Sequence, residues 1–333
     1  MIEKASEVRS ILVYTGMELL GDGVMKIPFI RSIRLAFPNA RITWMTGHGP
    51  TTLKSSLYSL VSKDIAEIIE ITRVGYSWKQ LFKFPEAWSQ RHFDLILDTQ
   101  SKKVRSLILR KIPHRYFISH AWGWLLSDAK PPKNYQRPPH LVDCLIDMVT
   151  FSVGYRPEPS LNIDIPEDYT QQAASLLPEE GRYLGLSPGA GQDKKCWPLE
   201  NYIEVGKLFG SQGLIPTFIL GPREIRWQEE IAKQIPTALF PLQQTTETSP
   251  LLTMALARRM AAIVANDSGV GHLLAIGNQP ILTLFGPTSA ERYAPQTPYG
   301  KVLTSHKVGN GRSIATIPVF QVTQALSQML LVI

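Results

Sequence analysis

The chain has 333 residues, of which 44% are hydrophobic, so it is long enough for two domains with ordinary cores. Its 35 basic and 28 acidic residues give a formal net charge of +7, which suits an anionic partner such as a nucleotide, a phosphorylated glycolipid or a membrane face. No apolar stretch approaches the roughly 20 residues of a membrane span, and the charged N-terminus argues against a secretory signal. The two cysteines, Cys144 and Cys196, are far apart and form neither a disulfide framework nor a zinc motif. We therefore expect a cytoplasmic protein.

In the first half of the chain, apolar runs alternate with helical patterns. Strands are predicted at 10–15, 41–46, 94–98 and 115–118, and helices at 26–37, 51–62, 78–90 and 102–111. A proline-rich loop at 131–140 and an amphipathic helix at 141–153 follow. This order is typical of βαβ units around a mostly parallel sheet. It predicts a doubly wound N-terminal domain over residues 1–160.

The second half follows a stretch rich in proline and acidic residues, 155–168, which we interpret as the connection between domains. Strands are predicted at 183–187, 215–220, 237–240, 261–265 and 280–285, and helices at 199–211, 223–234, 250–259, 269–277 and 319–331. This pattern predicts a second doubly wound domain over residues 161–333. Because ligands of such sheets bind beyond the carboxyl ends of the strands, we expect both substrates in a cleft between the domains.

Two turns in the second half have the composition of phosphate-binding loops. The turn at 187–198 reads S-P-G-A-G-Q-D-K-K-C-W-P, and its glycines leave backbone donors open beside the cation of Lys195. The turn at 266–272 reads N-D-S-G-V-G-H, and its small residues let N–H groups at the start of a helix approach an anion. The same residues are also common in purely structural turns, and the local sequence leaves both readings open.

Together with two stretches in the first half, these turns resemble glycosyltransferase family 9, the lipopolysaccharide heptosyltransferases. The first stretch is L-G-D-x-x-x-x-x-P at 20–28, and the second is a strand ending in D-x-Q at 98–100. The resemblance runs from about residue 10 to residue 330 and implies an α/β fold of the GT-B type, with two Rossmann-like domains facing each other across a cleft. The chain departs from the family pattern at 16–18 and at 270–271.

The resemblance implies an inverting glycosyltransferase that moves a heptose or related sugar from an ADP-sugar to a lipopolysaccharide core or related glycan. No metal and no other cofactor is expected. Asp22 would be the general base that takes the proton of the acceptor hydroxyl. On local sequence alone, the same aspartate would instead cap a helix that starts near residue 24.

The resemblance also implies a donor site in the second domain. Lys195 would neutralise the leaving diphosphate, whereas Asp267 would accept sugar hydroxyls, because a carboxylate beside a phosphate is repulsive. The alternatives are that Glu224 merely begins a helix and that His272 packs in a core. The complete expected donor site is Ser187, Gly189, Lys195, Glu224, Asp267, Ser268, Gly269 and His272.

On the acceptor side, Lys102, Arg105 and His140 lie where the family binds its lipid-linked acceptor, and their charges suit anionic groups. An ordinary solvated surface would explain the same residues. The partners implied are a nucleotide-sugar donor, an anionic glycolipid acceptor and peripheral contact at the inner face of the inner membrane, with no nucleic acid.

Three other functions are weighed against this one. A nucleotide-sugar epimerase can share the fold but would need further acid and base residues, which the sequence does not mark. A non-catalytic sugar-nucleotide-binding protein would have no need of a base such as Asp22. A dehydrogenase is disfavoured because no G-x-G-x-x-G follows the first strand.

Overall fold

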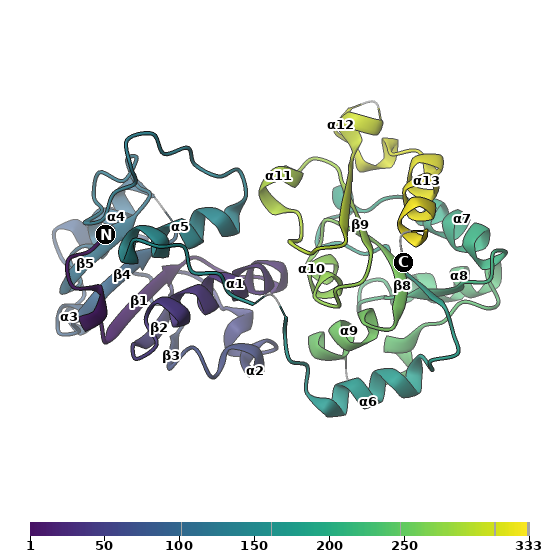
Figure 1. Cartoon of the computed structure of the whole chain (residues 1–333), viewed down its shortest axis with the longest axis horizontal. Helices are drawn as coiled ribbons and strands as arrows, with labels where there is room; N and C mark the ends of the chain where they lie inside the picture. The colour runs from purple at the N-terminus through teal and green to yellow at the C-terminus, as the bar shows by residue number, and fades with distance from the viewer. Residues whose placement is uncertain (101, 161, 247, 310, 332–333) are drawn as a thin grey trace. The chain divides into compact units, whose positions relative to one another are not determined.

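The computed structural model describes residues 1–100, 102–160, 162–246, 248–309 and 311–331. The chain divides into two compact units, Met1–Ser160 and Leu161–Ile333. Each unit is built around one five-stranded sheet, and in both sheets all neighbouring strands run parallel (Figure 1).

The sheet of the first unit has the order β3-β2-β1-β4-β5. Its strands are β1 (Ser10–Thr15), β2 (Arg41–Thr46), β3 (Glu67–Ile69), β4 (Phe93–Asp98) and β5 (His114–Ser119). The four strands predicted here are confirmed. Helices and loops bury both faces of this sheet, so the sequences of its strands are nearly continuous apolar runs that are easy to recognise. The strand order reverses between β1 and β4, where ligands of such sheets commonly bind.

The helices of the first unit differ more from expectation. Helix α1 (Leu20–Ala36) begins six residues before the predicted start at 26 and packs against α5 (Leu141–Val153), as Figure 1 shows. The glycines before Val24 read as a turn, yet Gly23 lies inside the helix, where a Cβ atom would come within 2.5 Å of the Thr52 hydroxyl. The glycine at position 23 therefore allows α1 to pack closely against the segment that contains Thr52.

The predicted long helices at 51–62 and 78–90 are wrong as continuous elements. The first is divided into η2 (Thr52–Lys54) and α2 (Tyr58–Val61), and the second into η3 (Trp78–Leu81) and α3 (Glu86–Ser89). Pro85 stands directly before α3, and a residue before proline avoids helical angles, which interrupts the second helix. The remaining helices of this unit are η1 (Ala5–Glu7) and α4 (Lys103–Leu109).

The sheet of the second unit has the order β10-β9-β8-β6-β7, so its strand order reverses between β6 and β8. Its strands are β6 (Tyr183–Ser187), β7 (Ile215–Phe218), β8 (Met260–Asn266), β9 (Ile281–Phe285) and β10 (Gly300–Thr304). Residues 237–240 form no strand and contribute only the isolated bridge between Thr217 and Leu239, which corrects the prediction there. The edge strand β10 was not predicted.

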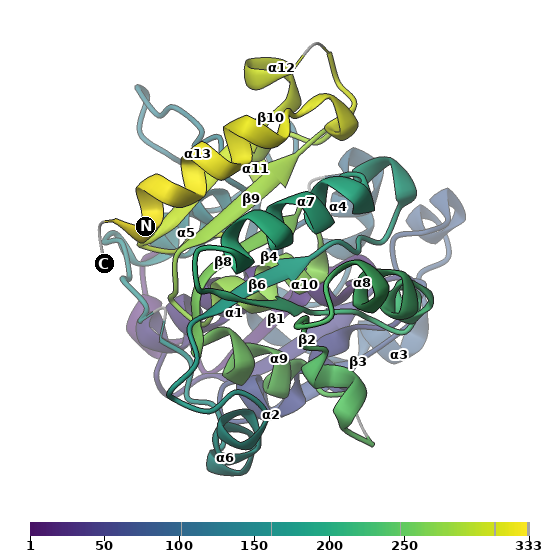
Figure 2. The ribbon, with the colours of Figure 1, turned by 90° about the vertical axis from the view of Figure 1, so that its right-hand side faces the viewer.

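Helices cover both faces of the second sheet. Figure 2 shows α7 (Leu199–Gly210) and α13 (Val319–Leu330) beside each other on one face, over a core that contains Trp197, Tyr202 and Phe209. Helix α6 (Glu167–Leu176) was not expected; its acidic first turn, which we read as part of a linker, favours a helix N-terminus. The other helices are α8 (Gln228–Gln234), α9 (Pro250–Ala257), α10 (Gly269–Ala275), α11 (Ala290–Tyr293), α12 (Ser305–Val308), η4 (Asp193–Lys195), η5 (Ile225–Trp227), η6 (Pro241–Gln244) and η7 (Ile314–Thr316).

Among the helices of the described residues, none is both long enough and apolar enough to cross a bilayer.

Candidate functional site

The polar residues of the second unit gather where its strand order reverses, at the carboxyl ends of β6 and β8. Asn266, the last residue of β8, is fully buried and connects the two predicted turns. Its Oδ1 accepts hydrogen bonds from Trp197 N at 3.2 Å and from the Tyr202 hydroxyl at 3.0 Å, and its Nδ2 donates to Pro188 O at 2.7 Å. Burial raises the pKa of Tyr202, so its hydroxyl remains a donor. Asn266 therefore fixes the 187–198 turn against the end of β8.

Lys195 and Asp267 form an ion pair at this edge, with Nζ at 2.7 Å from Oδ2. The Thr288 hydroxyl donates to the same carboxylate oxygen. The side chain of Asp267 is 7% exposed and that of Lys195 is 23% exposed. The prediction assigned Lys195 to the diphosphate and Asp267 to the sugar, and the structure shows the two side chains in direct contact. Since Thr288 also holds Asp267, the ammonium can move to an incoming anion while the carboxylate keeps a donor.

The start of α10 is shaped by close backbone contacts. Ser268 caps the helix, because its Oγ accepts from Gly271 N at 3.0 Å. A Cβ atom at position 271 would lie 2.7 Å from Asn266 O, so the glycine that departs from the family pattern is required by packing. Gly269 begins the helix, and His272 is buried one turn after the Ser268 cap. The ligand-binding roles of these residues stay predictions.

Glu224 and Gly189, both members of the predicted donor site, lie close together. A Cβ atom at Gly189 would lie 2.6 Å from the Glu224 carboxyl carbon, and one at Gly221 would lie 2.7 Å from a Glu224 oxygen. The carboxylate thus lies against the backbone of the 187–198 turn and of Gly221 in its own segment. Glu224 also immediately precedes η5, so the alternative that it begins a helix is met as well. Ser187 ends β6 with a buried hydroxyl that has no hydrogen-bond partner among the described residues.

Cys196 lies in the 187–198 turn but has no features of a reactive thiol. Burial raises the pKa of this thiol, which disfavours the nucleophilic thiolate.

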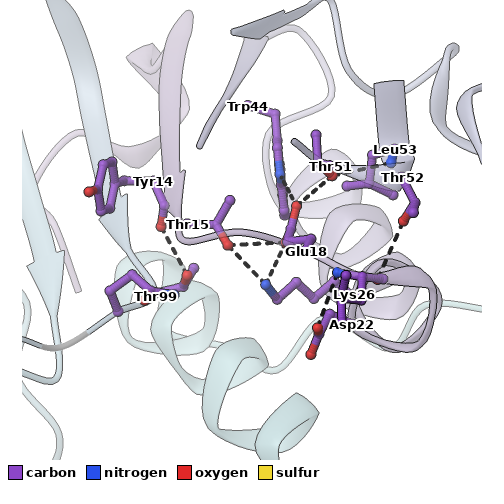
Figure 3. A network of polar contacts seen from close by, with 12 residues as sticks. Tyr14, Thr15, Glu18, Asp22, Lys26, Trp44, Thr51, Thr52, Leu53 and Thr99 are labelled. Carbon is purple, nitrogen blue, oxygen red and sulfur yellow. Dashed lines mark hydrogen bonds and ion pairs between the residues drawn. The ribbon is translucent and has the colours of Figure 1, made fainter. Parts of the chain in front are cut away.

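In the first unit, Asp22 does not lie in a loop after β1. It occupies the first turn of α1, and its Oδ2 accepts a hydrogen bond from Leu19 N at 3.2 Å (Figure 3). The alternative that Asp22 is the N-cap of a helix starting near residue 24 is therefore wrong: the helix begins at Leu20, Leu19 is its N-cap, and Asp22 is the third helical residue, whose side chain accepts the backbone N–H of that N-cap. The side chain remains partly exposed at the end of the segment that follows β1.

The segment before Asp22 is held by a buried polar network that the sequence did not reveal. Glu18 Oε1 accepts from Lys26 Nζ at 2.5 Å and from the Thr15 hydroxyl at 3.1 Å. Its Oε2 accepts from Trp44 Nε1 at 2.8 Å and from the Thr51 hydroxyl at 2.7 Å. Figure 3 shows these side chains converging on the Glu18 carboxylate from both sides.

The backbone of Glu18 is fixed too, because its N–H donates to Pro50 O at 3.1 Å. Position 18 lies in the stretch that departs from the family pattern, and this was the only signal it carried in the sequence. The network sets the path of the chain from β1 into α1, and so the place of Asp22.

The three predicted acceptor residues differ in their local contacts. The Arg105 guanidinium lies 4.0 Å from the centre of the Tyr76 ring and donates to Gln100 Oε1 at 3.3 Å, so it is ordered rather than simply solvated. Lys102 is exposed at the cap of α4. His140 caps α5, because its Nδ1 accepts from Val142 N at 3.2 Å, a structural role that the sequence did not suggest.

Within residues 1–331, leaving out the four undescribed positions 101, 161, 247 and 310, no group of three or more His, Cys, Asp or Glu side chains is arranged to hold a metal ion.

The chain is similar to known proteins in both sequence and structure. The family model for glycosyltransferase family 9 (heptosyltransferase) matches residues 81–314. The lipooligosaccharide heptosyltransferase 2 of Haemophilus influenzae is 30% identical over 312 residues, which cover 85% of each chain. The lipopolysaccharide core heptosyltransferase OpsX of the same species is 22% identical over 317 residues, 91% of this chain and 86% of the relative.

Two solved structures show the same fold. The glycosyl transferase family 9 protein from Veillonella parvula has a TM-score of 0.73 at 22% identity and covers 98% of both chains. The E. coli heptosyltransferase WaaC with ADP has a TM-score of 0.66 at 18% identity and covers 96% of this chain and 99% of its own. These likenesses confirm the predicted α/β fold of the GT-B type, with two Rossmann-like domains.

Proposed function

The chain belongs to glycosyltransferase family 9, and we propose that it transfers a heptose from ADP-heptose to the core of a lipopolysaccharide or a related glycolipid. That it is a glycosyltransferase follows from the family. The nature of the donor and of the acceptor is the proposal. It is supported by the names of the relatives and by the ADP bound to the E. coli neighbour. The observation that carries it is the ion pair of Lys195 and Asp267 at the carboxyl end of β8.

In the proposed reaction, the acceptor oxygen forms a bond to the anomeric carbon while the bond from that carbon to the diphosphate breaks, so the configuration inverts. Charge develops on the departing ADP, and a cation in reach stabilises it. Lys195 supplies this cation by exchanging Asp267 for a phosphate oxygen. Asp267, still held by Thr288, then accepts hydroxyl groups of the sugar. Ser187 and Gly189 belong to the same turn, and the buried Ser187 hydroxyl has no hydrogen-bond partner among the described residues.

The acceptor hydroxyl must lose a proton as it attacks. Asp22 is the proposed base, since it is a partly exposed carboxylate whose backbone is fixed on both sides, by α1 and by the Glu18 network. One of its oxygens accepts the Leu19 N–H, and the other is left for the acceptor. Arg105, ordered against Tyr76, is the proposed contact for an anionic group of the acceptor, with Lys102 beside it on α4.

The test of the donor is nucleotide binding. A ligand that binds only the folded state raises its apparent stability in proportion to the logarithm of its concentration over Kd. ADP and ADP-heptose should raise the melting temperature more than UDP, GDP and their sugars. Equal or larger shifts with the uridine compounds would contradict the proposed donor while leaving the family assignment intact.

The test of the reaction is product analysis. With ADP-heptose and a lipopolysaccharide core acceptor, the protein should release ADP and lengthen the acceptor by one heptose. Epimerised sugar nucleotide formed without an acceptor would instead show the epimerase activity weighed above. The cytoplasmic location is part of the same proposal, because nucleotide sugars are cytoplasmic donors, and cell fractionation tests it.

A further inference from the structure

Two neighbouring elements of the first unit expose large apolar side chains. Trp78 on η3 is 64% exposed and Phe82, directly after it, is 81% exposed, with their rings edge to face at 6.1 Å. On α4, Val104 and Leu107 are 48% and 36% exposed, one turn apart on the same face of the helix. Single exposed apolar residues are ordinary, but a contiguous group indicates an interaction surface.

The two elements lie against each other. Arg105 Nε donates to Gly75 O at 3.4 Å near the start of α4, and Lys111 Nζ donates to Leu81 O just beyond its end. Leu81 packs against the same core cluster as Ile108 of α4. The segment 75–82 therefore runs along the helix, and we call the exposed face formed by Trp78, Phe82, Val104 and Leu107 the η3–α4 surface.

This surface is also strongly basic. Lys79, Lys83, Lys103 and Lys111 are exposed on the same two segments, and none of them forms an ion pair with a described residue. Residues 102–115 contain six lysines and arginines and no acidic residue. Arg115 is paired with Glu7 and the exposed Glu86 follows four residues after Phe82, but the four lysines have no ion-pair partner among the described residues, so the two segments carry a net positive charge.

We infer that the η3–α4 surface docks onto the anionic face of a phospholipid bilayer. Trp78 and Phe82 would enter the headgroup region, where aromatic rings are favoured, while the lysines contact lipid phosphates. A protein partner fits less well, because lysine is depleted in protein–protein interfaces and here it alternates with the apolar side chains. The inference rests on the proposed function in one respect: an enzyme with a lipid-linked acceptor has a reason to reach the membrane.

Vesicle sedimentation of the full chain tests this without donor or acceptor. The protein should pellet with vesicles of phosphatidylethanolamine and phosphatidylglycerol but not with phosphatidylcholine alone, and raised salt should weaken the binding. Trp78→Ser combined with Phe82→Ser should lower the partition coefficient by about tenfold or more. Lys79→Glu combined with Lys83→Glu should lower it by a similar factor, since each basic side chain near an anionic surface contributes on the order of fivefold.

Matched controls come from the second unit. Tyr299→Ser combined with Phe320→Ser replaces side chains that are 59% and 63% exposed, and Lys233→Glu reverses one exposed charge. Both controls should partition like the wild type, and the melting temperature of every variant shows that it is folded. Equal losses in the controls, or no wild-type binding to anionic vesicles, would overturn the inference.

Binding only to native membranes, abolished when those membranes are treated with protease, would identify a protein partner and would also overturn it. Nucleotide binding is measured on the same variants. A wild-type protein that binds ADP but does not bind anionic vesicles would count against this inference alone. A wild-type protein that does not bind ADP would count against the proposed donor.

Discussion

Replacing Lys26 with Met should destabilise the first unit strongly. The change leaves the Glu18 carboxylate, whose side chain has no exposed area, without its cation at 2.5 Å. Breaking a buried ion pair by removing one partner costs about 3–5 kcal/mol. For a unit of this size, each kcal/mol shifts the melting temperature by roughly 2–4 °C, so we expect the transition of the first unit to fall by roughly 6–20 °C.

The matched control is Lys54→Met, which removes the partner of Glu70 at 3.3 Å in a pair whose lysine is 51% exposed. Such a surface pair contributes at most about 1 kcal/mol. Thermal unfolding followed by calorimetry separates the two variants. If Lys26→Met cost no more than Lys54→Met, the buried network would not stabilise the fold as argued.

A second variant separates charge from packing. Glu18→Gln combined with Lys26→Met removes both charges, and removing a buried pair together is much less costly than removing one member. Stability should therefore recover in part relative to Lys26→Met alone. A double variant that is less stable than Lys26→Met alone would show that the network acts through its hydrogen bonds to Trp44 and Thr51 and not through its charges.

Three further substitutions test the candidate site. Asp22→Asn should lower kcat by about 10²–10⁴-fold with little change in ADP affinity or melting temperature, because the amide can still accept the Leu19 N–H; a rate near that of the wild type would remove Asp22 from the mechanism. Lys195→Ala should weaken ADP binding by roughly 10- to 150-fold, the value of a charge-assisted hydrogen bond, whereas the exposed neighbour Lys194→Ala should not; calorimetric titration decides, and equal effects would refute the assignment. Gly271→Ala should cost about 1–3 kcal/mol in urea unfolding because its Cβ would meet Asn266 O, while Gly191→Ala, with nothing within 4 Å, should be neutral.

The sequence predicted the strands better than the helices, for a physical reason. Strands such as β1 and β8 are buried on both faces, so burial alone makes them continuous apolar runs that any reading detects. The strands β3 and β10 were missed because they are short or lie at a sheet edge and are only partly buried. Helix starts depend on local close approaches, as at Gly23, where composition suggests a turn and packing requires a glycine within the helix.

Within the candidate site, residues in contiguous motifs could be predicted, whereas residues that act through contacts distant in the sequence could not. Lys195 and Asp267 stand in turns that follow strands, where contiguous motifs carry the family resemblance, so the sequence could nominate them. Thr288 and Asn266 gain their roles only from contacts across 21 and more positions, and neither was predicted. The partners of Glu18 come from β1, α1, β2 and the segment before η2, and no periodicity connects positions so far apart.

Three ion pairs among the described residues involve a buried carboxylate, those of Glu18, Asp147 and Asp267, and the first and the last differ in their freedom to bind a ligand. Glu18 accepts four hydrogen bonds, and its partner Lys26 is 9% exposed, so neither charge can turn to a ligand without leaving the other buried and unpaired. Lys195 is 23% exposed, and Asp267 retains the Thr288 hydroxyl when the lysine moves. An incoming diphosphate can therefore take the ammonium at a modest cost, because the carboxylate left behind keeps a donor. The Glu18 pair fixes the backbone that carries Asp22, and the Lys195–Asp267 pair has the freedom that the proposed exchange with a diphosphate requires.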